Sequence, residues 1–319
     1  MAGVPRACPV KCAAGKTIKY TVFSARKLSC LTPTRVQNMT FLQLFILSIV
    51  QGFAELLPVS SSAHVIMAEK LMGLDPTSPE LTMLLVMLHT GTMFAVIVYF
   101  WKSWRATYFS STAAFRSNVL LLVAATAMTG IVGLGLLKLI THVVMADTPG
   151  FEIEHLFGNA KLMAAALAAA GVLIIVSSRM KARDTGVLSV PKAIVIGAVQ
   201  GLCLPFRGFS RSGATISTGI AMGVPQRRAE EFSFALAVVL TPAVLVKEGW
   251  RFYKAIADGT IAHAGGVGHL IAPSLIGMVL SFLAGLLALR WLSSWLEQGR
   301  WHFFGAYCLA ASLVVLWVG

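Results

Sequence analysis

The sequence predicts an all-α integral membrane protein, with about six transmembrane helices and two re-entrant helical hairpins arranged as an inverted repeat. Hydrophobic residues make up 57% of the 319 residues and charged residues only 12%, a composition far from that of a soluble domain. The apolar residues form runs long enough to cross about 30 Å of hydrocarbon as helices. A duplicated pair of polar breaks predicts the repeat.

Six apolar runs are expected to span the membrane. They cover approximately residues 82–101, 118–139, 161–178, 232–250, 270–290 and 302–318. Helices satisfy their own backbone hydrogen bonds, which lipid cannot do, and these runs are too continuous for barrel strands. The net charge of +13 does not indicate nucleic acid, because basic residues stand at the ends of apolar runs. We expect residues 39–319 to form a single membrane domain with no nucleic-acid partner.

Residues 1–38 differ from the rest of the chain. They hold seven of the 26 Lys and Arg residues and no acidic residue. They lack the continuous apolar core of a secretory signal, and Met39 opens the first strongly apolar run. We expect a basic extension that is either disordered or the result of a misassigned start. N-terminal sequencing of the native protein distinguishes the two, because finding Met1 contradicts a misassigned start.

An internal duplication relates repeat 1, residues 41–101, to repeat 2, residues 192–250. Gln51-Gly52 matches Gln200-Gly201 at an offset of 149 residues, and Trp101 matches Trp250 at the same offset. Each copy contains two short helical pieces separated by a Pro- and Ser-containing break. Such interrupted segments at matching positions indicate re-entrant helices that meet near the membrane midplane. Non-helical backbone at that depth must be surrounded by protein or line a wet cavity, so the two breaks are expected to line one cavity.

Charges near the spans predict the orientation. Basic residues flank the connections at 102–116 and 179–192, whereas acidic residues occupy the loop at 147–154. The positive-inside rule places the two basic connections in the cytoplasm and the acidic loop outside. The first hairpin then enters and returns on the outer side, and the second on the cytoplasmic side. The two repeats are therefore expected to be inverted.

The first break carries candidate catalytic residues. Gln51 and Glu55 are spaced i, i+4 and so share one helix face. An ionisable residue in an apolar segment is costly and indicates function; the alternative is a structural carboxylate paired with Arg. Three serines, Ser60 to Ser62, follow where helix N-caps belong, and His64 lies one turn beyond Ser61. Capping needs one hydroxyl, whereas this group offers a nucleophile, backbone N–H donors and an imidazole.

The second break places Arg211 at a predicted helix start, among Ser210, Ser212 and Thr215. A guanidinium beside helix N-terminal N–H groups can bind phosphate, because it stays charged and donates two parallel hydrogen bonds. The alternative for this segment alone is an Arg that extends to the interface beside capping serines. Its expected place opposite the first break favours phosphate binding.

Two stretches resemble the signatures of one protein family. QGFAELLPVSSSAH, residues 51–64, resembles the first signature of the bacterial undecaprenyl-diphosphate phosphatases, the bacitracin-resistance family, and GFSRSGAT, residues 208–215, resembles the second. The similarity covers nearly all of residues 41–319. It implies hydrolysis of undecaprenyl diphosphate to undecaprenyl phosphate and phosphate, which recycles the lipid carrier of cell-wall synthesis. It also implies the bacterial inner membrane, with the active site open toward the periplasmic side.

The resemblance also implies the site residues, which by their numbers here are Glu55, Ser60, Ser61, His64, Ser210, Arg211 and Thr215. We expect the catalytic group to be Glu55, Ser61, His64 and Arg211, with His64 and Glu55 as the acid/base pair. We expect phosphate to be bound by Ser60, Ser62, Ser210, Ser212, Thr215 and Arg207. Arg207 belongs to a stretch, Pro205-Phe206-Arg207-Gly208, that stands where the family usually has Pro-Gly. A divalent cation, Mg²⁺ or Ca²⁺, is expected at Glu55 and Gln51, and Gln51 leaves one charge fewer than two carboxylates would.

The expected reaction is attack on the terminal phosphorus, with Arg211 and helix N–H groups stabilising the equatorial oxygens. Whether Ser61 forms a phospho-enzyme or positions water stays open at this point. A lipid-phosphate flippase is the alternative, because inverted repeats with broken helices are also a transporter architecture. A purely structural membrane protein would leave the repeated polar breaks unexplained. The expected partners are a polyprenyl diphosphate and membrane lipids, and a homo-oligomer stays open.

Overall fold

The structure, a computed structural model, describes residues 39–74, 79–144, 159–180, 186–206, 208–257 and 268–318. Every regular element in these ranges is helical, as the composition predicts. The elements are α1 (Phe41–Leu56), α2 (Ser61–Leu71), α3 (Pro79–Tyr108), α4 (Thr112–Leu139) with the π-helical segment η1 (Ile140–Val144), α6 (Ala160–Arg179), α7 (Val190–Leu202), α8 (Arg211–Ala221), α9 (Gln226–Ala257), α10 (Gly268–Glu297) and α11 (Trp301–Val318). The basic extension at 1–38, the acidic loop at 147–154 and Arg207 lie outside the described residues.

Five of these helices are long and apolar enough to cross a membrane, judged by length and composition: α3, α4, α6, α9 and α10. Each contains one of the predicted spans. The sixth predicted span, 302–318, is α11, whose 18 residues rise about 27 Å. By length α11 stands with the shorter apolar helices α1 and α7. Large apolar side chains are exposed along the long helices, Ile131 by 66% and Leu287 by 57% for example, as a lipid-facing surface requires.

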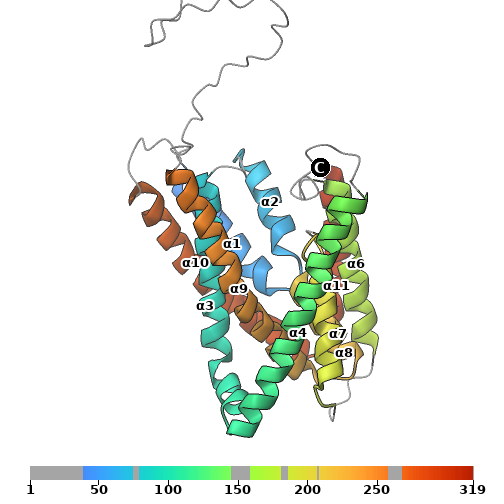
Figure 1. Cartoon of the computed structure of the whole chain (residues 1–319). Helices are drawn as coiled ribbons and strands as arrows, with labels where there is room; N and C mark the ends of the chain where they lie inside the picture. The colour runs from blue at the N-terminus through green and yellow to red at the C-terminus, as the bar shows by residue number, and fades with distance from the viewer. Residues whose placement is uncertain are drawn as a thin grey trace, which may run out of the picture. The chain divides into compact units, whose positions relative to one another are not determined.

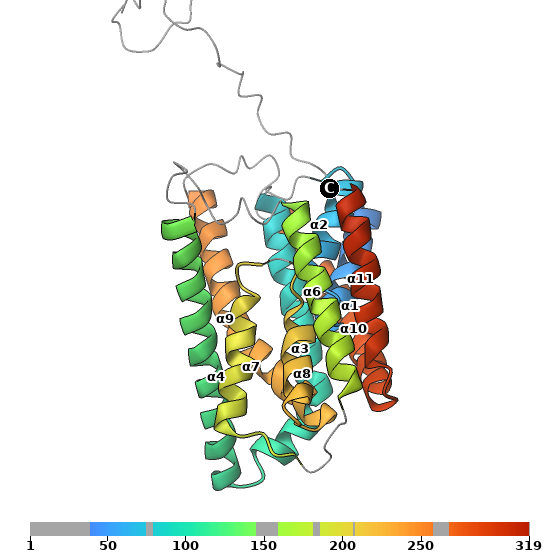
Figure 2. The same ribbon diagram turned by 90° about the vertical axis from the view of Figure 1, so that its right-hand side faces the viewer.

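The two hairpins are re-entrant and inverted. Their helices, α1, α2, α7 and α8, have 16, 11, 13 and 11 residues, too few for a full crossing. In Figure 1, α1 and α2 occupy the end where α3 begins, whereas α7 and α8 occupy the opposite half. Figure 2 shows α7 and α8 both reaching back to that opposite end. The inverted repeat predicted from the duplication is therefore confirmed.

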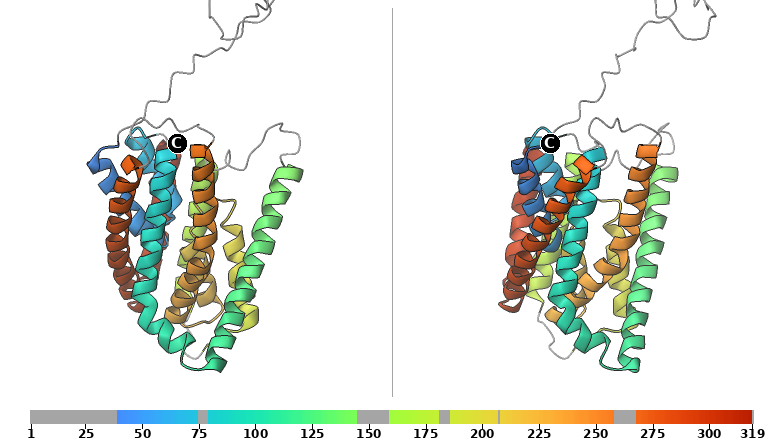
Figure 3. Two further views of the ribbon diagram at one scale, coloured as in Figure 1. Left: turned by 60° about the vertical axis from the view of Figure 1, so that its left-hand side comes forward. Right: turned by 90° about the vertical axis from the view of Figure 1, so that its left-hand side faces the viewer.

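The packing of the hairpins follows the same inversion. Helix α1 packs on α10, the helix after repeat 2, and α7 packs on α4, the helix after repeat 1. The glycine of the duplicated Gln-Gly pair permits both contacts. A Cβ at Gly52 would lie 2.5 Å from Ala284 Cβ, and one at Gly201 would lie 2.8 Å from Val132 Cβ. Small residues at these positions let the helices approach closely. Both views in Figure 3 show the blue and yellow hairpins displaced toward opposite ends of the helices.

Candidate active site

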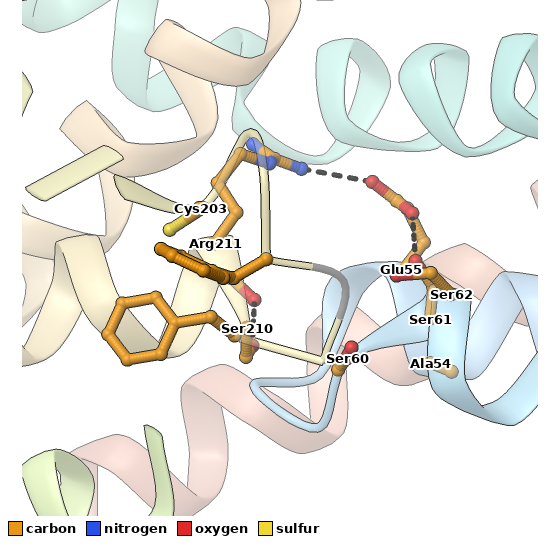
Figure 4. A pocket seen from close by; sticks show the side chains of 11 residues that line it. Ala54, Glu55, Ser60, Ser61, Ser62, Cys203, Ser210 and Arg211 are labelled. Atoms are coloured by element: carbon orange, nitrogen blue, oxygen red, sulfur yellow. Dashed lines mark hydrogen bonds and ion pairs between the residues drawn. The ribbon is translucent and has the colours of Figure 1, made fainter. Parts of the chain in front are cut away.

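The two breaks meet at a cavity of about 180 Å³. Its lining comes from the end of α1, the start of α2, the α7–α8 connection and the start of α8 (Figure 4): Ala54, Glu55, Ser60, Ser61, Ser62, Cys203, Phe206, Phe209, Ser210, Arg211 and Ser212. The structure thus brings the two breaks together, as the repeat predicts. Seven of the eleven lining residues are polar or charged, so the cavity suits a charged group and not a hydrocarbon chain.

The carboxylate of Glu55 lies at the centre of the polar contacts. Ser61 Oγ donates a hydrogen bond to Oε2 at 2.6 Å, and Arg211 Nη2 donates to Oε1 at 3.0 Å (Figure 4). Gln51 Nε2 donates to Oε2 at 3.3 Å. The Glu55 side chain is only 17% exposed, and a carboxylate in such surroundings needs a cationic partner. One carboxylate therefore joins a serine of the first break to the arginine of the second.

His89 of α3 is a site residue that sequence reasoning missed. Its Nε2 lies 3.5 Å from Glu55 Oε2, and its Nδ1 lies 2.7 Å from the carbonyl oxygen of Leu85. A carbonyl only accepts, so Nδ1 donates a hydrogen to it, and Nε2 attracts the Glu55 carboxylate when it carries a hydrogen too, as in the imidazolium form. The available signal was a single histidine within the apolar run 82–101, where an ionisable residue is costly. The structure adds His89 to the groups that orient Glu55.

Replacing His89 by leucine is expected to lower kcat for diphosphate hydrolysis about tenfold, because Glu55 loses one of the groups that hold its carboxylate toward Ser61. His89→Gln is expected to keep most of the activity, since an amide N–H can donate to Glu55. Steady-state phosphate release by the two purified variants measures this. His302→Leu, at an exposed histidine near the start of α11, is the matched control. Equal activity of His89→Leu and wild type would contradict the prediction.

Arg211 is the first residue of α8, and its guanidinium has a free edge. The helix start is fixed by Ser210, whose Oγ accepts a hydrogen bond from the backbone N–H of Gly213 at 3.2 Å. Arg211 Nη2 pairs with Glu55, whereas Nη1 is buried and has no hydrogen-bond partner among the described residues. Buried polar atoms are nearly always paired. An unpaired guanidinium nitrogen on a residue that lines a polar cavity is a ready donor for an anionic ligand.

The remaining predicted residues of the second break have structural contacts. Ser212 Oγ donates to the carbonyl oxygen of Leu57 at 3.3 Å and so ties the two breaks together. Thr215 is 1% exposed; its Oγ1 donates to the Arg211 carbonyl at 2.8 Å and lies 2.6 Å from Ser233 Oγ on α9. Thr215 is absent from the cavity lining. It therefore contacts α9 and the backbone of Arg211, and its role in phosphate binding stays a prediction.

Ser60 and His64 form a separate pair of contacts. Ser60 has φ +68° and is the non-glycine residue with positive φ in the described ranges, a conformation that costs about 1–3 kcal/mol and often marks functional sites. His64 Nδ1 donates to the Ser60 carbonyl at 2.8 Å, and Nε2 accepts from Tyr307 Oη at 2.7 Å. The His64 ring stacks on Tyr307 at 5.6 Å. His64 is thus placed to hold the strained turn before Ser61, and its pairing with Glu55 stays a prediction.

Comparison with known proteins gives a consistent result. A family profile described as Bacitracin resistance protein BacA matches residues 44–314. The chain is 63% identical over 278 residues to Undecaprenyl-diphosphatase 2 of Acinetobacter baylyi, covering 87% of this chain and 98% of that protein. It is 33% identical over 296 residues to Undecaprenyl-diphosphatase of Desulfosudis oleivorans, covering 86% and 97%. It is 29% identical over 284 residues to Undecaprenyl-diphosphatase of Parabacteroides distasonis, covering 87% and 98%.

Proposed function

The chain belongs to the bacitracin resistance protein BacA family, and from this premise we propose that it hydrolyses undecaprenyl diphosphate to undecaprenyl phosphate and phosphate. The observation that supports this activity is that Ser61 and Arg211 both contact the carboxylate of Glu55. A serine hydroxyl lies 2.6 Å from Glu55 Oε2 and a guanidinium nitrogen 3.0 Å from Oε1. This combines a nucleophile, its base and an anion-binding group in one cavity. The reaction recycles the lipid carrier of cell-wall synthesis.

The geometry supports attack by Ser61. Its Oγ forms a bond to the terminal phosphorus while its proton moves to Glu55 Oε2, and the bond from that phosphorus to the bridging oxygen breaks, releasing undecaprenyl phosphate. Arg211 Nη1 and the N–H groups at the start of α8 hold the equatorial oxygens, where charge builds up in the transition state. Water then attacks the phosphorus of the phosphoserine, the bond from that phosphorus to Ser61 Oγ breaks as Oγ takes the proton back from Glu55, and phosphate leaves with the atoms of the water. The competing route is direct attack by a water that Ser61 positions.

Phosphate release from farnesyl diphosphate by the purified protein tests the proposed function. We expect release to depend on the protein and to be lost in Arg211→Ala, while the variant keeps the helical content of the folded protein. Movement of the lipid across vesicles without phosphate release would instead select the flippase. Acid quench during turnover with radiolabelled substrate separates the two hydrolytic routes, because only attack by Ser61 leaves labelled phosphoserine.

We also propose that a divalent cation, Mg²⁺ or Ca²⁺, assists the reaction. Glu55 and Gln51, whose side chains lie 3.3 Å apart, would hold it together with substrate phosphate oxygens, a common arrangement for Mg²⁺. The described residues contain no group of three or more His, Cys, Asp and Glu side chains that could hold a metal, so the substrate would supply most ligands. Once bound, the cation would neutralise diphosphate charge.

Removing the cation is expected to abolish most of the phosphate release, and adding Mg²⁺ to restore it. Calorimetric titration of Mg²⁺ into the protein with a non-hydrolysable diphosphate should show binding that weakens in Glu55→Gln. Full activity after exhaustive chelation would contradict a metal-assisted reaction.

We propose that the protein lies in the bacterial inner membrane with the first hairpin on the periplasmic side. Among the residues that the structure describes, more basic residues stand at the end where α3 and α6 finish and α7 and α9 begin than at the other end. At the first end these are Lys102, Arg105, Arg116, Arg179, Lys192, Arg227, Arg228, Arg290 and Arg300, and at the second Lys70, Lys138, Lys161, Lys247, Arg251 and Lys254. A reporter fused after Gly319 should then be active only outside the cytoplasm; activity only inside would contradict this orientation.

A further inference from the structure

A second, smaller cavity adjoins the Glu55–Arg211 pair. It has a volume of about 20 Å³ and is lined by both residues of the pair, which also line the first cavity. Most of the other lining residues lie on α3 and α9, among them Met93 and Val96 of α3 and Ala237 and Val238 of α9. We name this cavity the α3–α9 seam. It differs from the first cavity in chemistry, because its walls beyond the ion pair are mainly apolar.

Exposed residues stand next to the seam on both helices. Its lining residues recur at three- and four-residue spacing on both helices, so each helix presents one face to the other. The residues next to these faces are exposed: Phe94 by 46% and Val98 by 57% on α3, and Val239 by 47% on α9. On membrane-spanning helices such side chains face hydrocarbon. The seam therefore lies beside exposed, lipid-facing positions on both helices.

Aromatic and polar contacts close one end of the seam. Phe100 stacks on Phe234 at 5.4 Å and on Trp104 at 5.7 Å. Just beyond, Ser103 Oγ donates a hydrogen bond to the Glu231 carboxylate, and Trp104 Nε1 donates to the Glu231 carbonyl at 3.3 Å. These contacts hold α3 against α9 at the end where α3 finishes and α9 begins. A chain in the seam would accordingly run toward the other end, where the first hairpin lies.

We propose that the α3–α9 seam is the path by which the isoprenoid chain of the lipid diphosphate passes from the site into the bilayer. The inference rests on the proposed function, because it takes the diphosphate to be held by Arg211. Leaving the chain in hydrocarbon is favoured by about 0.8 kcal/mol for each CH₂ kept out of water, and the first cavity is too polar to accept it. The seam is an apolar space that reaches the same guanidinium.

The closed seam holds no more than a group the size of a water molecule. The first isoprene unit can therefore enter only if the side chains between α3 and α9 change rotamer. Met93 is suited to this, because its unbranched side chain changes shape at little cost. A bulky residue introduced at Val238 would fill the seam, whereas the same residue at the adjacent, lipid-facing Val239 would not. These two positions form a matched pair for testing the path.

The first test compares Val238→Trp and Val239→Trp with farnesyl diphosphate and methyl diphosphate as substrates. We expect Val238→Trp to lower kcat/KM for farnesyl diphosphate at least tenfold while keeping that for methyl diphosphate within twofold of wild type. Val239→Trp should change neither by more than twofold. An equal fall for both substrates, or no fall for either, would overturn the proposed path. Absence of phosphate release by the wild type would instead overturn the proposed function.

A second test uses the unmodified protein and needs only binding. A farnesyl diphosphate analogue with a diazirine in the first isoprene unit is irradiated with the protein in detergent or bilayers, and the labelled peptides are identified by mass spectrometry. We expect label on the α3 peptide around Met93 and the α9 peptide around Val238, and competition by excess farnesyl diphosphate. If the label that excess farnesyl diphosphate removes lies only on α2 or α11, the isoprenoid chain binds elsewhere and the proposal is overturned.

Discussion

Replacing Ser61 by alanine is expected to lower kcat for lipid diphosphate hydrolysis by roughly 10⁴-fold, because loss of the proposed nucleophile removes the covalent route and leaves only what binding and charge stabilisation provide. The Ser61 hydroxyl donates a hydrogen bond to Glu55 Oε2 at 2.6 Å. Without this hydroxyl, Glu55 has no serine proton to accept. Steady-state phosphate release measures the fall, and acid quench should find no phosphoserine in the variant.

The control for Ser61 is Ser178→Ala. Ser178 lies on α6, where its Oγ donates only to the Ile175 carbonyl of its own helix at 2.6 Å, so its removal should leave kcat within twofold. If Ser61→Ala keeps more than a tenth of the wild-type rate, Ser61 is not the nucleophile. If acid quench finds no phosphoserine in the wild-type protein during turnover, direct attack by water is favoured.

Replacing Arg211 by alanine is expected to lower kcat/KM by about 10³-fold, since the charged donor proposed to hold the transferring phosphoryl group is lost. Arg211→Lys should recover part of this, because an ammonium keeps the charge but cannot donate two parallel hydrogen bonds. Arg227→Ala is the matched control, because the Arg227 side chain is 72% exposed and lies in the first turn of α9.

Loss of Arg211 also affects folding, and the two effects can be separated. The single variant leaves the Glu55 carboxylate without its guanidinium partner, which costs about 3–5 kcal/mol for a buried pair. The double variant Arg211→Ala with Glu55→Gln removes that unpaired charge, so its melting temperature should rise above that of Arg211→Ala while its activity stays low. Activity that recovers together with stability would show that Arg211 acts only as a structural partner.

The sequence alone determined the class of fold, the positions of the helices and the inverted repeat. Each of the six predicted spans lies inside an observed helix, because hydrocarbon forces an apolar run of that length to satisfy its own hydrogen bonds. The ends of α1 at Leu56 and of α7 at Leu202 also depend on local sequence. Proline ends a helix and serine caps the start of the next one in any tertiary context. The duplicated Gln-Gly pair predicted two equivalent hairpins, and the glycine explains why both pack closely.

Only the tertiary structure decided which side chains meet. Gln51 and Gln200 occupy equivalent positions in the repeats, yet Gln51 donates to Glu55 and Gln200 to Thr129 on α4. His64 contacts Tyr307, 243 residues away in the chain, and His89 reaches Glu55 from α3. Such pairings depend on the rotation of each helix about its axis and on its neighbours. Local periodicity does not specify these, because an apolar span can present any of its faces to lipid and still bury the rest.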